Sequence, residues 1–249
     1  MVSFNIKLAD KVIGIKVNYP ETLEFCENYL TDLAEDFSVS VSLADIEKEA
    51  LHSDEGRRQE GLKHLKYAPQ YLETLALYRK IAEALSEYGV ILFHGSALAL
   101  DGEVYIFTAK SGTGKSTHAG LWREAFGERC VMVNDDKPLI GIKDGVVTVY
   151  GTPWNGKHKL GENMSAPLKA ICILGRAEQN SICPVTKQRA FAEVFSQTYR
   201  SDSPVRMQNI LKTVDDMLSL VPVYRLGCNM NIEAAHVAYN GMRGQKNEA

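Results

Sequence analysis

The sequence has few cysteines, and their spacing does not suggest a site. The 249 residues include five cysteines, an odd number, and no two of them form a Cys-x-x-Cys pair. Neither a disulfide framework nor a zinc site built on paired cysteines is therefore expected. Most of the thiols fall in apolar stretches, which favours buried, reduced side chains. The five are Cys26, Cys130, Cys172, Cys183 and Cys228.

An excess of charge of one sign is also missing. Lys and Arg number 28 against 31 for Asp and Glu, which gives a net charge of −3 without any basic run. Such a chain is not expected to bind nucleic acid or a membrane surface. No apolar run reaches membrane-spanning length, and the first residues lack the basic stretch and apolar block of a secretion signal. We therefore expect a cytoplasmic protein.

Apolar residues make up 45% of the chain, enough to bury a full core. Hydrophobic patterns predict a hairpin before Val17, a helix at 21–33, a strand at 37–43 and a charged helix or connector at 45–66. We take residues 1–66 as a small α+β segment. Residues 67–249 alternate apolar strands with amphipathic helices, which predicts an α/β domain. Its first helix, at 71–88, is expected to support the sheet.

Residues 109–116 read Ala-Lys-Ser-Gly-Thr-Gly-Lys-Ser, a P-loop (Walker A) pattern in which Ala109 replaces the first glycine. A β-branched and aromatic strand is predicted before it and a helix after it, at 117–126. In that context backbone N–H groups surround a polyphosphate, Lys115 supplies a cation and Ser116 supplies a metal-binding hydroxyl. The expected nucleotide-binding residues are Ser111, Gly112, Thr113, Gly114, Lys115, Ser116 and Thr117.

Two other predicted strands end in residues suited to phosphoryl transfer. The strand at 130–133 is followed by Asn-Asp-Asp, and adjacent carboxylates at a strand end point in different directions. One of Asp135 and Asp136 can therefore bind a metal ion while the other accepts a proton from a hydroxyl. A plain strand-ending turn is the alternative. The strand at 90–93 is followed by His94, which taken alone is more typical of a structural role.

The order of these pieces resembles the superfamily shared by HPr kinase/phosphorylase and phosphoenolpyruvate carboxykinase. That pattern is a strand ending in His-Gly or His-Cys, a hairpin, Ser-Gly-x-Gly-Lys-Ser/Thr, and a strand ending in Asp-Asp. The chain has His94-Gly95, residues 111–116 and Asp135-Asp136, all within residues 90–156. The resemblance implies a mixed-sheet P-loop domain with helices packed around it. It also implies that His94 and Asp136 lie near a metal ion and that Asp135 transfers a proton, with the two Asp roles exchangeable.

The chain also departs from this pattern. It is far shorter than a carboxykinase, and the residues after Asp136 lack the downstream signature of the kinase/phosphorylase, so no substrate can be carried over. It resembles uncharacterised bacterial members of the superfamily. The segment 151–157, Gly-Thr-Pro-Trp-Asn-Gly-Lys, is predicted either to close over the phosphates with Trp154 and Lys157 or to be a connector with Trp154 in the core.

Two further predictions concern residues outside those motifs. Arg176 follows a predicted strand at 168–174 and is a candidate for stabilising charge on the transferred phosphoryl group. His118 and Trp122 lie four residues apart on the predicted helix and are expected to pack on one face.

The sequence therefore predicts an ATP-dependent phosphotransferase that moves the γ-phosphate to a hydroxyl, with Asp135, Lys115, His94 and Arg176 as catalytic residues. The acceptor is a serine of a protein or peptide, or a small metabolite, and the resemblance also permits the reverse reaction. The expected cofactors are ATP and Mg²⁺, with Mn²⁺ as the alternative ion. Ser116, Asp136 and His94 are expected to bind the metal ion. A homo-oligomer is compatible with this prediction. The alternative function is a nucleotide-binding regulatory module with a partner on residues 1–66 and little or no ATPase activity.

Overall fold

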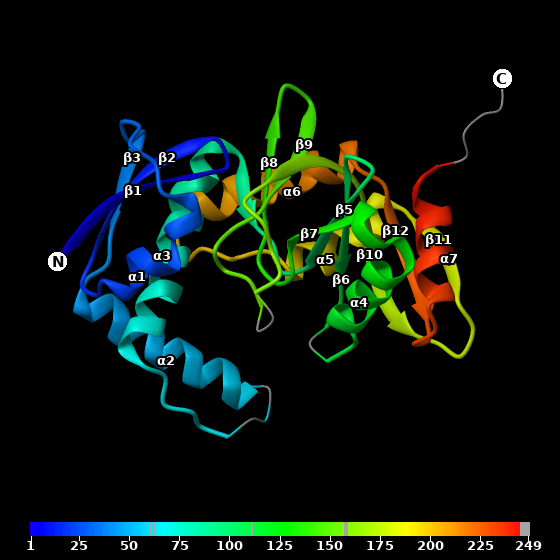
Figure 1. Ribbon diagram of the computed structural model, residues 1–249, viewed down its shortest axis with the longest axis horizontal. Helices are drawn as coiled ribbons and strands as arrows, with labels where there is room; N and C mark the ends of the chain where they lie inside the picture. The colour runs from blue at the N-terminus through cyan, green and yellow to red at the C-terminus, as the bar shows by residue number, and fades with distance from the viewer. Residues whose placement is uncertain (60, 62, 111, 157–158, 245–249) are drawn as a thin grey trace. The chain divides into compact units, whose positions relative to one another are not determined.

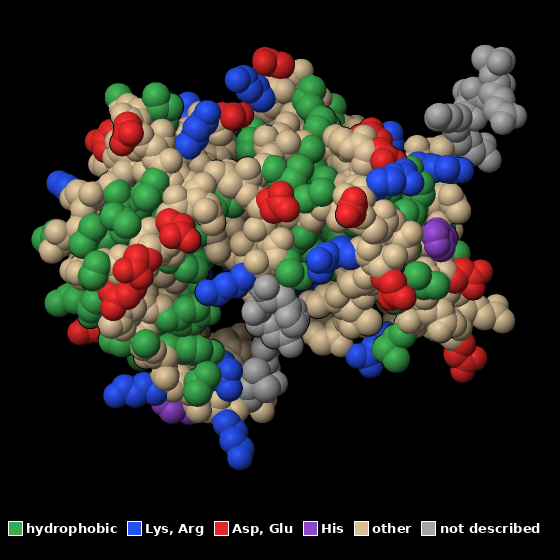
Figure 2. Space-filling view, viewed as in Figure 1, with side chains coloured by type: hydrophobic (Ala, Val, Ile, Leu, Met, Phe, Trp, Pro, Cys, Tyr) green, Lys and Arg blue, Asp and Glu red, His purple; other side chains and the backbone are tan. Residues whose placement is uncertain are grey.

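The computed structural model describes residues 1–59, 61, 63–110, 112–156 and 159–244 (Figure 1). The chain divides into two compact units, Met1–Ala84 and Leu85–Ala249. Within the described residues, no helix is long and apolar enough to span a membrane. On the face drawn in Figure 2, Lys and Arg side chains are interspersed with Asp and Glu rather than gathered into one patch.

The first unit is a three-stranded sheet with helices, as expected for an α+β segment. Strand β2 pairs antiparallel with β1 and parallel with β3. The elements are β1 (Val2–Leu8), β2 (Lys11–Val17), α1 (Glu21–Phe25), η1 (Glu27–Tyr29), β3 (Phe37–Ser40), α2 (Leu43–Gln59) and α3 (Pro69–Leu85), whose last residue begins the second unit.

Two predicted boundaries in this unit were wrong. The helix expected over 21–33 ends at Phe25, and Leu30 is extended and forms an isolated β-bridge with Ile6. The strand expected over 37–43 ends at Ser40, because Ser42 and Asp45 bond to each other's backbone N–H groups. That reciprocal arrangement is a capping box, and it starts α2 at Leu43.

Glu73 of α3 joins that helix to the rest of the first unit. Its buried carboxylate accepts hydrogen bonds from the backbone N–H groups of Asn18 and Tyr19, the Asn18 amide and the Thr22 hydroxyl, at 2.6–3.1 Å. Arg79 and Lys80 pair with Glu49 and Asp45 of α2. These polar contacts of Glu73, Arg79 and Lys80 lie within the first unit, and the compact units divide after Ala84 rather than at the predicted residue 66.

The second unit is a mixed α/β structure around a nine-stranded sheet. The strand order is β4-β8-β9-β10-β6-β5-β7, with β12 also paired to β10, and β11 paired to β12. Strand β10 is parallel to β6 and β12, whereas the other pairs are antiparallel. The strands are β4 (Val90–Leu92), β5 (Ser96–Leu100), β6 (Glu103–Thr108), β7 (Cys130–Asn134), β8 (Leu139–Lys143), β9 (Val146–Tyr150), β10 (Ser165–Arg176), β11 (Ser181–Val185) and β12 (Val223–Cys228).

Helices cover both faces of this sheet because its central strands are apolar on both sides. In β6, Val104 and Ile106 pack into one cluster, while Tyr105 and Phe107 pack into the other. The first cluster includes α5 and α6, and the second includes α4 and α7. The helices are α4 (Lys115–Phe126), α5 (Lys187–Ser196), α6 (Pro204–Leu220) and α7 (Glu233–Met242), with short 3₁₀ turns η2 (Ser86–Tyr88) and η3 (Gly127–Arg129).

The hairpin implied by the family resemblance is confirmed as β5 and β6, joined by Asp101 and Gly102, both with positive φ. Strand β5 had no signal of its own in the sequence. All five of its residues are buried, so polar alternation is absent, and its Ser-Ala-Leu-Ala-Leu composition lacks β-branched residues. The edge strand β11 was also missed, because Pro184 and the exposed residues around it do not read as a strand.

Replacing Glu73 by Gln should destabilise the protein, because the amide has one acceptor oxygen where four donors now meet a carboxylate. We expect urea unfolding of the full chain, followed by far-UV circular dichroism, to show a loss of about 1 to 3 kcal/mol. The exposed Glu47→Gln on α2 is the matched control and should change the unfolding free energy by less than about 0.5 kcal/mol. Equal stability of the two variants would contradict the role assigned to Glu73.

Candidate functional site

The ends of several strands meet at one edge of the large sheet. The register aligns Ser96 with Phe107, Ala97 with Asn134, and Ile173 with Thr108. The start of β5 and the carboxyl ends of β6, β7 and β10 therefore lie together, and Arg176 at the end of β10 is paired with Cys228 at the end of β12. This register brings the predicted site residues to one place, although they are far apart in the sequence.

The loop at 109–114, called the glycine loop below, connects β6 to α4. Ser111 lies outside the described residues. Gly112 and Gly114 have φ of 76° and 121°, and a Cβ on either would meet nothing within 4 Å. Glycine is needed here for backbone conformation rather than for space. The loop ends at Gly114, whose carbonyl accepts the His118 N–H, so α4 begins with Lys115, and Ser116 and Thr117 are exposed in its first turn.

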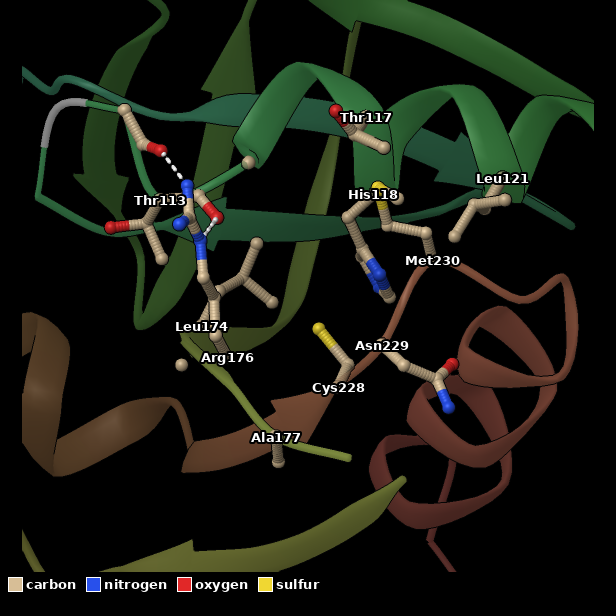
Figure 3. A pocket seen from close by; sticks show the side chains of 13 residues that line it. Thr113, Thr117, His118, Leu121, Leu174, Arg176, Ala177, Cys228, Asn229 and Met230 are labelled. Carbon is tan, nitrogen blue, oxygen red and sulfur yellow. Dashed lines mark hydrogen bonds between the residues drawn. The ribbon is translucent and has the colours of Figure 1, made fainter. Parts of the chain in front are cut away.

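Two basic side chains donate hydrogen bonds to carbonyl groups of this loop. Lys115 donates to the Ala109 carbonyl at 3.2 Å, and burial lowers the pKa of its ammonium, opposed by the charge of Asp136. Arg176 donates to the Gly112 and Thr113 carbonyls at 2.7 and 3.4 Å, as Figure 3 shows. The predicted catalytic Arg176 therefore lies at the glycine loop, with its guanidinium directed at loop carbonyls.

His94 lies between Asp136 and Gln197. Its Nε2 is 3.4 Å from an Asp136 carboxylate oxygen, and its Nδ1 is 3.2 Å from the Gln197 side-chain oxygen. Its backbone N–H donates to the Gln197 carbonyl, and its own carbonyl accepts from Thr108 at the end of β6. Burial, and then the charge of Lys115, hold the pKa of His94 below its ordinary value, with Asp136 opposing them. The imidazole is thus favoured in its neutral form.

Asn134 fixes the two aspartates that follow it. Its buried side-chain oxygen accepts the backbone N–H groups of Asp136 and Lys137, at 2.9 and 2.6 Å. Its amide nitrogen donates to the hydroxyl and carbonyl of Thr152, at 3.0 and 3.3 Å, and the Thr152 hydroxyl donates to the Lys137 carbonyl. The turn after β7 and the segment from residue 151 are therefore held as one network.

Within this network the two carboxylates face different partners. Asp135 accepts the Gly156 N–H at 2.5 Å, and a Cβ on Gly156 would come within 2.9 Å of that carboxylate. Asp136 instead faces His94 and Lys137. Of the two expectations for Trp154, the connector is confirmed: Trp154 is 3% exposed. Lys157 lies outside the described residues.

The donor atoms near His94 can bind a metal ion only if further ligands complete its coordination. Among the described residues, no cluster of three or more His, Cys, Asp or Glu side chains is placed to hold one. A carboxylate and a hydroxyl suit Mg²⁺ when phosphate and water oxygens complete the set, and an added imidazole moves the preference toward a transition metal such as Mn²⁺. The residues present fit a metal that arrives with a phosphate-bearing ligand.

Sequence reasoning missed three residues that position this site. Gln197 follows α5 and contacts His94, but nothing in the sequence marked it. Asn134 and Thr152 were visible only as parts of a turn and a connector. An asparagine at the end of a buried strand and next to an acidic pair is a signal that could have indicated this network, because a buried amide needs hydrogen-bond partners.

The fold and site define a mixed α/β protein with a glycine loop at the start of a helix and an acidic pair on a neighbouring strand. A family model described as SynChlorMet cassette protein ScmC matches residues 66–234, and the chain belongs to that family. The comparison with curated proteins found no match.

Among solved structures, the Hpr(Ser) kinase/phosphatase from Coxiella burnetii is similar at 10% identity, over 60% of this chain and 94% of that one, with a TM-score of 0.35. A similarity at that TM-score establishes neither a shared activity nor shared site residues.

Changing Asn134 to Asp should destabilise the turn, because a buried carboxylate cannot donate to Thr152 and brings an unpaired charge. We expect a loss of about 2 to 4 kcal/mol in urea unfolding. The exposed Asn231→Asp is the control and should lie within about 0.5 kcal/mol of the parent. A stable Asn134→Asp variant would show that the network does not hold the turn.

The pKa of His94 should respond to both neighbouring charges. Lys115→Met removes a cation that disfavours the imidazolium, so the pKa should rise, whereas Asp136→Asn removes an anion that favours it, so the pKa should fall. Both can be followed by NMR titration of the His94 ring signals in chelator-treated protein. Shifts of the opposite sign in either variant would contradict this arrangement of charges.

Proposed function

We propose that this protein is an ATP-dependent phosphotransferase that moves the γ-phosphate to a hydroxyl group. The observation that carries the proposal is the glycine loop that leads into α4 with Lys115 bonded to the Ala109 carbonyl, together with the 3.4 Å approach of His94 Nε2 to the Asp136 carboxylate. A cation, a neutral imidazole and a carboxylate thus share one site beside the glycine loop. Phosphoryl transfer requires phosphate binding, charge neutralisation and alignment of the nucleophile.

Each residue has a distinct part in this proposal. The described loop and helix residues Gly112–Thr117, together with Ser111, bind the phosphates through backbone N–H groups and the α4 N-terminus. Lys115 neutralises phosphate charge. Arg176 fixes the loop through its two carbonyl contacts and keeps a positive charge beside the phosphates. Asp136, His94 and Ser116 hold Mg²⁺, or Mn²⁺, which supplies further charge neutralisation when bound.

Asp135 is the proposed general base. The acceptor oxygen forms a bond to the γ-phosphorus while the bond from that phosphorus to the β,γ-bridging oxygen breaks, and ADP leaves. The hydroxyl proton passes to the Asp135 carboxylate, which Gly156 and the turn network hold at the strand end. The acceptor is a serine of a protein or peptide, or a small metabolite.

The test combines calorimetry with transfer of label from γ-labelled ATP in the presence of Mg²⁺ and cell extract. Asp135→Asn should retain nucleotide binding and lose about 10²- to 10⁴-fold in transfer, the range for a lost general base. Lys115→Ala should weaken nucleotide binding. Asp144→Asn, on the exposed β8–β9 turn with φ of 51°, is the matched control and should behave as the parent.

Three results would count against the proposal. Undiminished transfer by Asp135→Asn would reject that residue as the base. No heat of binding for any nucleoside triphosphate would reject the nucleotide site. Nucleotide binding that changes the capture of a partner, without any labelled acceptor, would favour the regulatory module instead.

A further inference from the structure

A pocket of about 550 Å³ adjoins the glycine loop (Figure 3). Three segments form its wall: the loop at Gly112–Gly114, the first turns of α4, and the residues that end or follow β10 and β12. Its volume lies within the roughly 300 to 1,000 Å³ usual for small-molecule sites. A ligand with phosphates on the loop would therefore have this pocket available for its remaining atoms.

The pocket wall contains a buried polar side chain without a partner. His118 is 2% exposed and lines the pocket from α4, and neither ring nitrogen forms a hydrogen bond among the described residues. A buried nitrogen without a hydrogen bond destabilises the protein, and a ligand that bonds to it would remove that cost. Phe107 packs edge-to-face against the imidazole, with ring centroids 4.6 Å apart. This contact fixes the orientation of the His118 ring.

Two other polar side chains around the pocket, Arg176 and Asn229, have hydrogen-bond partners of their own. Arg176 is bonded to the loop carbonyls. The Asn229 amide donates to the Glu178 carbonyl, and its oxygen accepts the Asn231 N–H. Much of the remaining wall is apolar, from Leu121, Leu174, Ala177, Cys228 and Met230. The lining therefore offers a flat apolar group a place to bind, with His118 as a polar contact.

We propose that this pocket takes the heteroaromatic base of the nucleotide and that His118 hydrogen-bonds the edge of that base. The assignment rests on the proposed function, because it places the phosphates on the glycine loop. One ring nitrogen of a neutral imidazole donates and the other accepts, so either a donor or an acceptor on a base edge can find a partner on His118. Apolar side chains and the Met230 thioether suit the faces of an aromatic ring.

The charge and the accessibility of His118 are compatible with that contact. Burial lowers the pKa of His118 to about 4, so the ring is neutral at pH 7. Its nitrogens are shielded from solvent, and a ligand would reach them when part of the wall moves aside. Met230 lines the same pocket and is 79% exposed, and its side chain has three rotatable bonds, so its displacement costs little.

The test compares calorimetric binding of ATP with that of inorganic tripolyphosphate, which has the phosphates but no base. In the parent, ATP should bind more tightly than tripolyphosphate. His118→Phe keeps the ring against Phe107 but removes the nitrogens, so ATP should bind about tenfold more weakly while tripolyphosphate binding stays the same. GTP, CTP and UTP then report which base edge His118 reads.

Two further variants guard against a folding defect. Ala177→Trp fills the pocket from an exposed position and should also weaken ATP without affecting tripolyphosphate. His236→Phe, on the exposed side of α7, is the matched control and should bind both ligands as the parent does.

The outcomes separate this inference from the proposed function. Equal affinity for ATP and tripolyphosphate in the parent, or unchanged ATP affinity in both His118→Phe and Ala177→Trp, would overturn the base pocket and leave the phosphate site standing. A parent that binds neither ligand would overturn both.

Discussion

The candidate site depends on the side chain of one buried asparagine. Asn134 uses its oxygen to hold the backbone of Asp136 and Lys137 and its nitrogen to hold Thr152. Without it, the turn that directs Asp135 toward Gly156 and Asp136 toward His94 would lose its hydrogen bonds to the Asp136 and Lys137 N–H groups and to Thr152. A buried amide with every hydrogen-bonding group satisfied specifies one arrangement, because each alternative leaves a polar group unpaired.

The sheet supplies the second half of the arrangement. Because β6, β7, β10 and β12 all end at one edge, groups from distant parts of the sequence meet there without long connecting loops. The charges interact in consequence: Lys115 lowers the pKa of His94 and is itself influenced by Asp136. The proposed phosphate site adjoins the proposed base pocket, because Gly112–Gly114 and Arg176 also line that pocket.

Local patterns in the sequence predicted much of this unit, and contacts between distant residues explain the rest. The β6–loop–α4 succession was predictable because aromatic and β-branched residues, glycines and helix formers follow one another within a short span. Strand β5 was not predictable by composition, because burial on both faces removes alternation. The roles of Gln197 and Thr152 depend on a register that no local pattern encodes, and Trp154 could be assigned to the core only once its surroundings were known.

The attachment of Arg176 to the glycine loop has a consequence for the order of folding. Gly112 and Gly114 have positive φ, and Arg176, about sixty positions later, donates to the carbonyls of Gly112 and Thr113. These two contacts can form only after β10 has docked beside β6, a pairing of high sequence separation and hence a slow one. A nascent chain that has emerged only as far as α4 would carry the complete motif yet lack the two hydrogen bonds from Arg176.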